Sequence, residues 1–149
     1  MERKFKKQKI KIKKIKRVIL VPLKYGDDLL KAVSDFCIKN NIEMGFVYLI
    51  GALQKARFSY FNQKEKKYEE NSIEEPTEIV SCLGNISIKQ RKPFVHLHIS
   101  LADSKGNVFG GHLNEGSIIF AAECFIFELK GDKLERKLDE SSNLFLWDI

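Results

Sequence analysis

Apolar and polar positions alternate along most of the chain, and one segment has helical spacing instead. After Gly26, the apolar residues recur every three or four positions, and Asp27 is a residue type that caps helix N-termini. We therefore expect a helix that ends near Asn40 and Asn41. Its apolar stripe consists of Leu29, Leu30, Val33, Phe36 and Cys37.

The remaining segments predict mainly strands, because they are rich in β-branched and aromatic residues bounded by turn residues. Residues 63–75 have the polar composition of an exposed hairpin and loop, and Phe145 and Trp147 are expected to close the sheet at its C-terminal end. One helix among many strands predicts an α+β fold, a largely antiparallel β-sheet with one or two packed helices. The predicted strands are Arg17–Val21, Phe46–Ile50, Ala56–Phe61, Glu78–Ile88, Phe94–Ala102, a return strand starting at Asn107–Phe109, and Ser117–Leu129.

Charge divides the chain into two parts. Residues 1–17 hold ten of the 26 Lys and Arg residues and one of the 20 acidic residues. The rest of the chain therefore has 16 basic and 19 acidic residues, a formal charge of −3. We expect residues 1–16 to form a mobile basic arm and residues 17–149 to form a single domain.

Composition also limits the location and the redox chemistry. No apolar run approaches the roughly 20 residues of a membrane-spanning helix, and the N-terminus lacks the apolar core of a secretory signal, so we expect a cytoplasmic protein without a membrane span. Cys37, Cys82 and Cys124 are odd in number and contain no C-x-x-C pair. Free, buried thiols are therefore expected.

Histidines provide the most informative candidate chemistry. All three in the chain, His96, His98 and His112, lie within 17 residues. Residues two apart on a strand face the same side, so His96 and His98 project together while Leu97 faces the other way. An isolated His-x-His is commonly only a half-exposed strand face, but the clustering of every histidine favours one metal site.

His112 lies on the same face as His96 and His98 only if the number of residues in the hairpin loop sets the right register. A four-residue loop at Asp103–Gly106 would pair Ala102 with Asn107 and place His112 opposite Leu97, on the wrong face. One extra residue between the paired positions would bring His112 to the face of His96 and His98. We expect it either as a β-bulge at Gly110 and Gly111 or through a three-residue loop.

Three neutral imidazoles with a fourth position open to water are typical of a reactive zinc site. Imidazole also suits Ni, Cu, Fe and Co, so zinc is favoured by its availability. The metal could activate a water molecule or polarise a carbonyl group. Glu123, Glu78 and Asp103 are candidates to support or complete the ligand set, with Glu123 preferred because it lies within the apolar run Ile118–Leu129.

Three segments resemble a known family. Thr77–Asn85 (TEIVSCLGN), Pro93–His98 (PFVHLH) and Gly110–Leu113 (GGHL) are similar to the PPC (plants and prokaryotes conserved) domain, with a resemblance that spans residues 17–147. It implies a sandwich-like α+β domain, a homotrimer, and metal at the three histidines as in prokaryotic members. The plant relatives bind DNA, but they carry an Arg-Gly-Arg-Pro AT-hook that this chain lacks and have other residues at the histidine positions.

Two functions follow as alternatives. The first is a metal-dependent protein, with zinc as the expected ion, that acts on or senses a small molecule at a subunit interface. The second is a DNA-binding or regulatory protein whose basic arm contacts phosphates, although such tails often serve only solubility. Without a P-loop, nucleophile elbow or dinucleotide fingerprint, the sequence leaves any reaction open. The candidate DNA-contacting residues are Lys4, Lys6, Lys7, Lys9, Lys11, Lys13 and Lys14.

Overall fold

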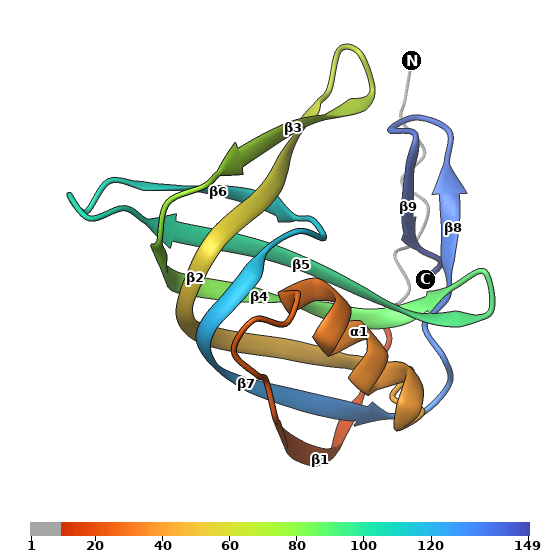
Figure 1. The fold of residues 1–149 in the computed structure, drawn as a ribbon. Coiled ribbons are helices and arrows are strands. Elements are labelled where there is room, and N and C mark those ends of the chain that lie inside the picture. The colour runs from red at the N-terminus through yellow and green to blue at the C-terminus, as the bar shows by residue number, and fades with distance from the viewer. Residues whose placement is uncertain (1–9) are drawn as a thin grey trace.

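A long, curved strand organises the main sheet. The computed structural model describes residues 10–149 (Figure 1), and in it β2 is continuous where the sequence predicts two strands. Its pairing register shifts near Gly51, which lets the strand bend across the sheet. The elements are β1 (Lys14–Val21), α1 (Leu29–Lys39), β2 (Gly45–Asn62), β3 (Lys67–Ile73), β4 (Thr77–Lys89), β5 (Lys92–Ala102), β6 (Val108–Leu113), β7 (Ile118–Lys130), β8 (Arg136–Asp139) and β9 (Leu144–Trp147).

The main sheet has the strand order β1-β7-β2-β4-β5-β6, and β3 pairs with β2 as the predicted hairpin. Every ladder between these strands is antiparallel. The far half of β2 also pairs with β6, so β2, β4, β5 and β6 form a closed circuit. The expected α+β fold with a largely antiparallel sheet is therefore confirmed.

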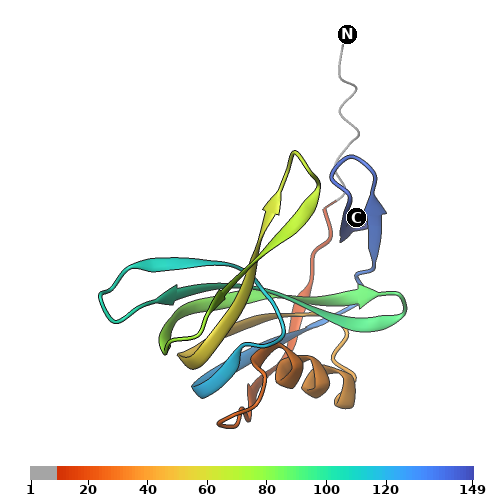
Figure 2. The same cartoon turned by 45° about the horizontal axis from the view of Figure 1, so that its top comes forward.

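Helix α1 covers one face of this sheet (Figures 1 and 2). Leu29, Val33 and Cys37 are fully buried beneath it, as the apolar stripe predicts. The N-terminal cap is Asp28 rather than Asp27, since the Asp28 side chain accepts from the Lys31 N–H at 2.9 Å. The carbonyl oxygen of Asp27 instead accepts from the Ile119 N–H of β7 at 2.9 Å, which keeps Asp27 outside the helix.

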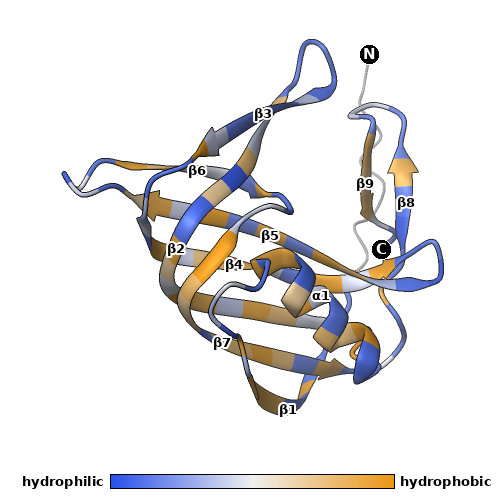
Figure 3. Ribbon diagram, in the orientation of Figure 1, coloured by the Kyte–Doolittle hydropathy of each residue, from blue (hydrophilic) through white to orange (hydrophobic). Residues whose placement is uncertain are grey.

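Apolar residues recur along the central strands, as the colouring of β2, β4 and β7 in Figure 3 indicates. The three cysteines are free and buried, as expected, and burial raises the pKa of each thiol to about 12. Their role in this structure is to pack in the core. Within residues 10–149, the helix is too short and too polar to cross a membrane.

Strand β1 lies at the edge of the sheet and begins at Lys14, three residues earlier than predicted. Lys16 and Arg17 bind the buried Glu128 carboxylate of β7 at 2.8 and 2.5 Å. Burial alone would raise the pKa of Glu128, but these hydrogen bonds hold it below its usual value. The buried carboxylate thus helps to hold β1 at the edge of the sheet.

The C-terminal residues do not close the main sheet, which corrects the prediction for Phe145 and Trp147. Strands β8 and β9 pair with each other as a separate hairpin, which rises on the face opposite α1 (Figure 2). The turn between them is tight, because the Asp139 carboxylate accepts hydrogen bonds from Ser141 and Ser142. Local pairing therefore replaces the expected long-range pairing.

Candidate metal centre

Strands β5 and β6 present the three histidines on the face opposite the helix. Val95, Leu97 and Ile99 of β5 are buried in the core, whereas His96 is half-buried and His98 is exposed. His98 pairs directly with His112 of β6. The predicted facing of the β5 histidines is confirmed.

The loop between β5 and β6 sets the position of His112. Ala102 pairs with Val108, and the Asp103 N–H donates to the Asn107 carbonyl oxygen at 3.1 Å, so residues 104–106 form the turn, as the three-residue alternative predicts. The register continues through Gly110 and Gly111 without a bulge. The cause is Asp103, whose carboxylate accepts from the N–H groups of Lys105 and Asn107 and from the Asn107 amide. Asn107 is thereby held opposite Asp103, and this register places His112 on the same face of the sheet as His96 and His98.

The two glycines of β6 have a different role from the predicted bulge. A Cβ atom on Gly110 would lie 1.9 Å from the Ile99 carbonyl oxygen, and one on Gly111 would lie 2.4 Å from the Ser59 carbonyl oxygen. Side chains at these positions would push β5 and β2 away from β6. Glycine therefore permits the close strand packing that holds His112 beside the other histidines.

One ligand nitrogen from each histidine lies within 4.8 Å of the other two. The ring centroids are 5.1 Å apart for His96 and His98, 4.9 Å for His96 and His112, and 5.5 Å for His98 and His112. The Nδ1 atom of His112 is buried and has no hydrogen-bond partner among residues 10–149. A buried polar atom without a partner is costly, and a metal ion would satisfy it.

The electrostatic surroundings keep two of the imidazoles neutral. Burial lowers the pKa of His96 to about 4, aided by the charges of His112, Arg136 and His98. Burial also lowers the pKa of His112 to about 4, aided by His98, Arg136 and Lys89. Neutral imidazole is the form that binds metal, so the donor set fits a divalent ion.

Basic and aromatic side chains surround the cluster on one side, and the sequence did not identify them. Tyr68 of β3 stacks near His112, with ring centroids 4.9 Å apart. Arg136 of β8 has a guanidinium nitrogen 3.4 Å from His96 Nδ1. With Lys89 and Phe94, these residues line a cavity of about 340 Å³ that includes His96 and His112.

The predicted carboxylates lie away from the histidines. Glu123 is exposed on β7 opposite Ile50, because successive residues of the apolar run alternate between two faces. Glu78 and Asp103 line a separate cavity of about 700 Å³. Among residues 10–149, no carboxylate joins the three nitrogen atoms.

The predicted DNA-contacting lysines are only partly described. Lys4, Lys6, Lys7 and Lys9 lie outside the described residues. Lys11 and Lys13 donate to the backbone carbonyls of Asp148 and Asp132, and Lys14 is the first residue of β1.

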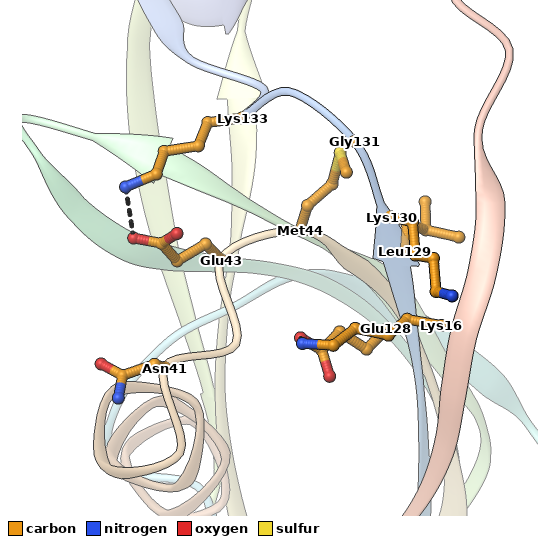
Figure 4. A pocket seen from close by; sticks show the side chains of 9 residues that line it. All are labelled: Lys16, Asn41, Glu43, Met44, Glu128, Leu129, Lys130, Gly131 and Lys133. Atoms are coloured by element: carbon orange, nitrogen blue, oxygen red, sulfur yellow. Dashed lines mark hydrogen bonds and ion pairs between the residues drawn. The ribbon is translucent and has the colours of Figure 1, made fainter.

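A second hollow, also of about 340 Å³, lies between β1 and the turn before β2 (Figure 4). Lysines surround it, but Lys133 pairs with Glu43 at 2.8 Å and Lys16 pairs with Glu128. Its charges are thus largely balanced within the chain. This hollow therefore has fewer groups free to bind a ligand than the histidine cluster has.

The chain is similar to known proteins of one domain family. The sequence profile of the Plants and Prokaryotes Conserved (PCC, also written PPC) domain matches residues 10–130. A metal-containing protein of Archaeoglobus fulgidus is 37% identical, with a TM-score of 0.88 over 94% of this chain and 99% of that chain. A PPC protein of Pyrococcus horikoshii is also 37% identical, with a TM-score of 0.89 over 95% of this chain and 98% of that chain.

Other relatives have different descriptions. A protein of Bacteroides thetaiotaomicron, assigned provisionally as DNA-binding, is 26% identical, with a TM-score of 0.80 over 93% of this chain and 98% of that chain. The bifunctional protein GlmU of a Synechococcus strain is 30% identical over 128 residues, which are 85% of this chain. The chain spans about a fifth of the length of the curated relatives it matches, since these residues are 19% of that GlmU.

The metal-free protein should lose stability as the pH falls from about 6.5 to about 4. Unfolded imidazoles titrate near 6.5, while folded His96 and His112 titrate near about 4, so protonation favours the unfolded chain in this window. The contribution of the neutral His96 and His112 side chains to the stability of the folded state is fully present above pH 6.5. Urea midpoints of wild type and of the double variant His96→Gln/His112→Gln, measured at pH 7, 5.5 and 4.5, isolate it. Equal pH profiles for the two proteins would contradict the assignment.

Proposed function

Because the chain belongs to the Plants and Prokaryotes Conserved domain family, we propose that it is a homotrimeric zinc-binding protein that acts on or senses a small molecule. The main support is the convergence of three imidazole nitrogens within 4.8 Å. His96, His98 and His112 would hold the ion. The similarity to a metal-containing protein of Archaeoglobus fulgidus adds to this support.

Zinc is favoured over Ni, Cu, Fe and Co by its availability. Three nitrogen ligands without a carboxylate or thiolate would leave a position open for water or substrate. A bound metal would supply Lewis acidity or an activated water. The chain itself contributes two imidazoles that stay neutral at physiological pH and a hydrogen-bond network that holds Arg136 beside them. Such a site suits either chemistry on a small ligand or its recognition.

Assembly into a homotrimer is supported by an apolar row on the sheet face opposite the helix. Leu20, Phe125, Tyr48 and Leu83 are direct cross-strand neighbours on β1, β7, β2 and β4. Their side chains are 39–70% exposed. A contiguous exposed apolar surface commonly marks an interface, and the number of copies rests on the family resemblance.

The apolar row ends at the histidines, because Leu83 pairs with His98 and His98 pairs with His112. An interface on this face would therefore reach the metal site. We also propose a cytoplasmic location, which the three free cysteines favour because disulfides are rare there.

DNA binding through a basic N-terminal arm, residues 1–16, is the alternative function. The ten basic residues of the first 17 favour it, together with the similarity to the Bacteroides protein. Phosphate contacts of this kind are independent of sequence and sensitive to salt. The body of the chain, with its formal charge of −3, would add little to such a footprint.

Replacing a histidine should remove the metal. Wild type reconstituted with zinc at pH 7.5 should hold one ion per chain, whereas His98→Ala should bind at least about 100-fold more weakly, because loss of a ligand exceeds the effect of losing a supporting residue. Elemental analysis and calorimetric titration measure this. Ser100→Ala, on the same face of β5, is the matched control. Wild type without metal after reconstitution would exclude the proposal.

A charge on the apolar row should prevent assembly. Phe125→Glu places a carboxylate at the middle of the row, where burial against a second copy would be unfavourable. Light scattering after gel filtration should give about three times 17.2 kDa for wild type and the monomer mass for the variant. Ile38→Glu changes an exposed apolar residue of α1 and should leave the mass unchanged. A wild-type monomer would contradict the proposed assembly.

DNA binding can be tested by deleting residues 1–9, which removes five basic residues and leaves β1 complete. If the arm contacts phosphates, duplex-DNA affinity at 50 mM salt should fall by at least about tenfold and the dependence on salt should become shallower. Fluorescence anisotropy at 50 and 200 mM salt measures both quantities. Unchanged affinity would exclude residues 1–9 as the DNA-binding element.

A further inference from the structure

The cavity beside the histidines contains a half-buried cation without an acidic partner. Arg136 donates to Ser87 Oγ, Asn85 Oδ1 and the Phe145 carbonyl oxygen, each at 2.7 Å. All three acceptors are neutral. Within residues 10–149, Arg136 forms no ion pair, and its five N–H donors are not exhausted by these bonds. The guanidinium is therefore fixed in place with its charge uncompensated.

A second cation lies in the same cavity. The Nζ atom of Lys89 is 4.8 Å from the ring centroid of Phe94 and 4.3 Å from that of Phe145. The Arg136 guanidinium carbon is 5.3 Å from the same Phe94 ring. Cation–π contacts stabilise each charge but do not neutralise it. Two like charges are thus held around one aromatic ring, and no carboxylate lines the cavity.

The proposed metal would increase this imbalance. Three neutral imidazoles contribute no negative charge, so a divalent ion would bring its full charge beside Arg136 and Lys89. Like charges held close together in a partly buried cavity repel one another. An anion in the cavity would offset the charges of the metal and of both side chains together.

Size and apolar lining limit the anion further. A volume of about 340 Å³ lies near the lower end of the roughly 300–1,000 Å³ typical of small-molecule sites. Phe94, Leu144 and Leu146 form apolar parts of the wall. The ligand that matches these features is small, with a charged end and an apolar end.

We propose that this cavity binds a small organic oxyanion, a carboxylate or a phosphoryl group attached to an apolar moiety. The oxyanion lies between Lys89, Arg136 and the metal, and the apolar moiety packs against Phe94 and Leu144. The inference rests on the proposed function, because it uses the metal at His96, His98 and His112 as one of the three positive groups.

Calorimetric titration of zinc-loaded protein with phenylacetate and with phenylphosphonate, at fixed ionic strength, tests this inference and distinguishes the two head groups. Lys89→Gln should weaken binding of the preferred probe by at least about tenfold, since it removes a charge-assisted contact. Lys137→Gln makes the same charge change on an exposed residue that pairs with Asp148, and it should bind like wild type. Inorganic phosphate, which lacks the apolar moiety, should bind more weakly.

Arg136→Lys provides a second variant, because it keeps the charge but loses the planar set of donors, and it should also weaken binding by about tenfold. Thermal denaturation of each variant checks that the C-terminal hairpin remains folded. Equal affinity of wild type and Lys89→Gln, or no binding of either organic probe, overturns the inference. Zinc content is measured in the same samples: one ion per chain without probe binding refutes this inference alone, whereas absence of zinc refutes the proposed function and the inference with it.

Discussion

The direct pairing of His98 with His112 across β5 and β6 is the constraint on which the site depends. Side chains of a strand alternate between two faces, so a shift of one residue in this ladder would move His112 into the core and leave two histidines alone. The Asp103 carboxylate opposes that shift by holding Asn107 opposite Asp103 at the turn. A surface turn thereby determines whether three imidazoles can meet.

Close packing of the strand backbones beneath the histidines keeps β4, β5 and β6 in contact. Gly84 of β4, like Gly110 and Gly111 of β6, lies against a neighbouring carbonyl; a Cβ atom there would be 1.8 Å from the His96 oxygen. The far half of β2 pairs with β6, which closes the circuit of strands. The histidines therefore project from a rigid surface, and a rigid surface favours a preorganised ligand set.

The sequence predicted the parts of the site that depend on local periodicity. The spacing of His96 and His98 was sufficient to place both on one face, and the apolar stripe of α1 identified its buried side. The position of His112 depended on hydrogen bonds that the Asp103 carboxylate accepts within the turn, which periodicity does not reveal. Arg136 was missed entirely, because it reaches the site only through a hairpin that pairs with itself instead of joining the main sheet.

The histidines lie between an apolar surface and a cavity that contains basic side chains. On one side, the apolar row of Leu20, Phe125, Tyr48 and Leu83 leads to His98. On the other side, the C-terminal hairpin brings Arg136 to the cavity. Assembly through the row would exclude water from the first side, which would lower the effective dielectric around a metal and its anion and strengthen their attraction. Binding of the anion and association of the subunits would then reinforce each other.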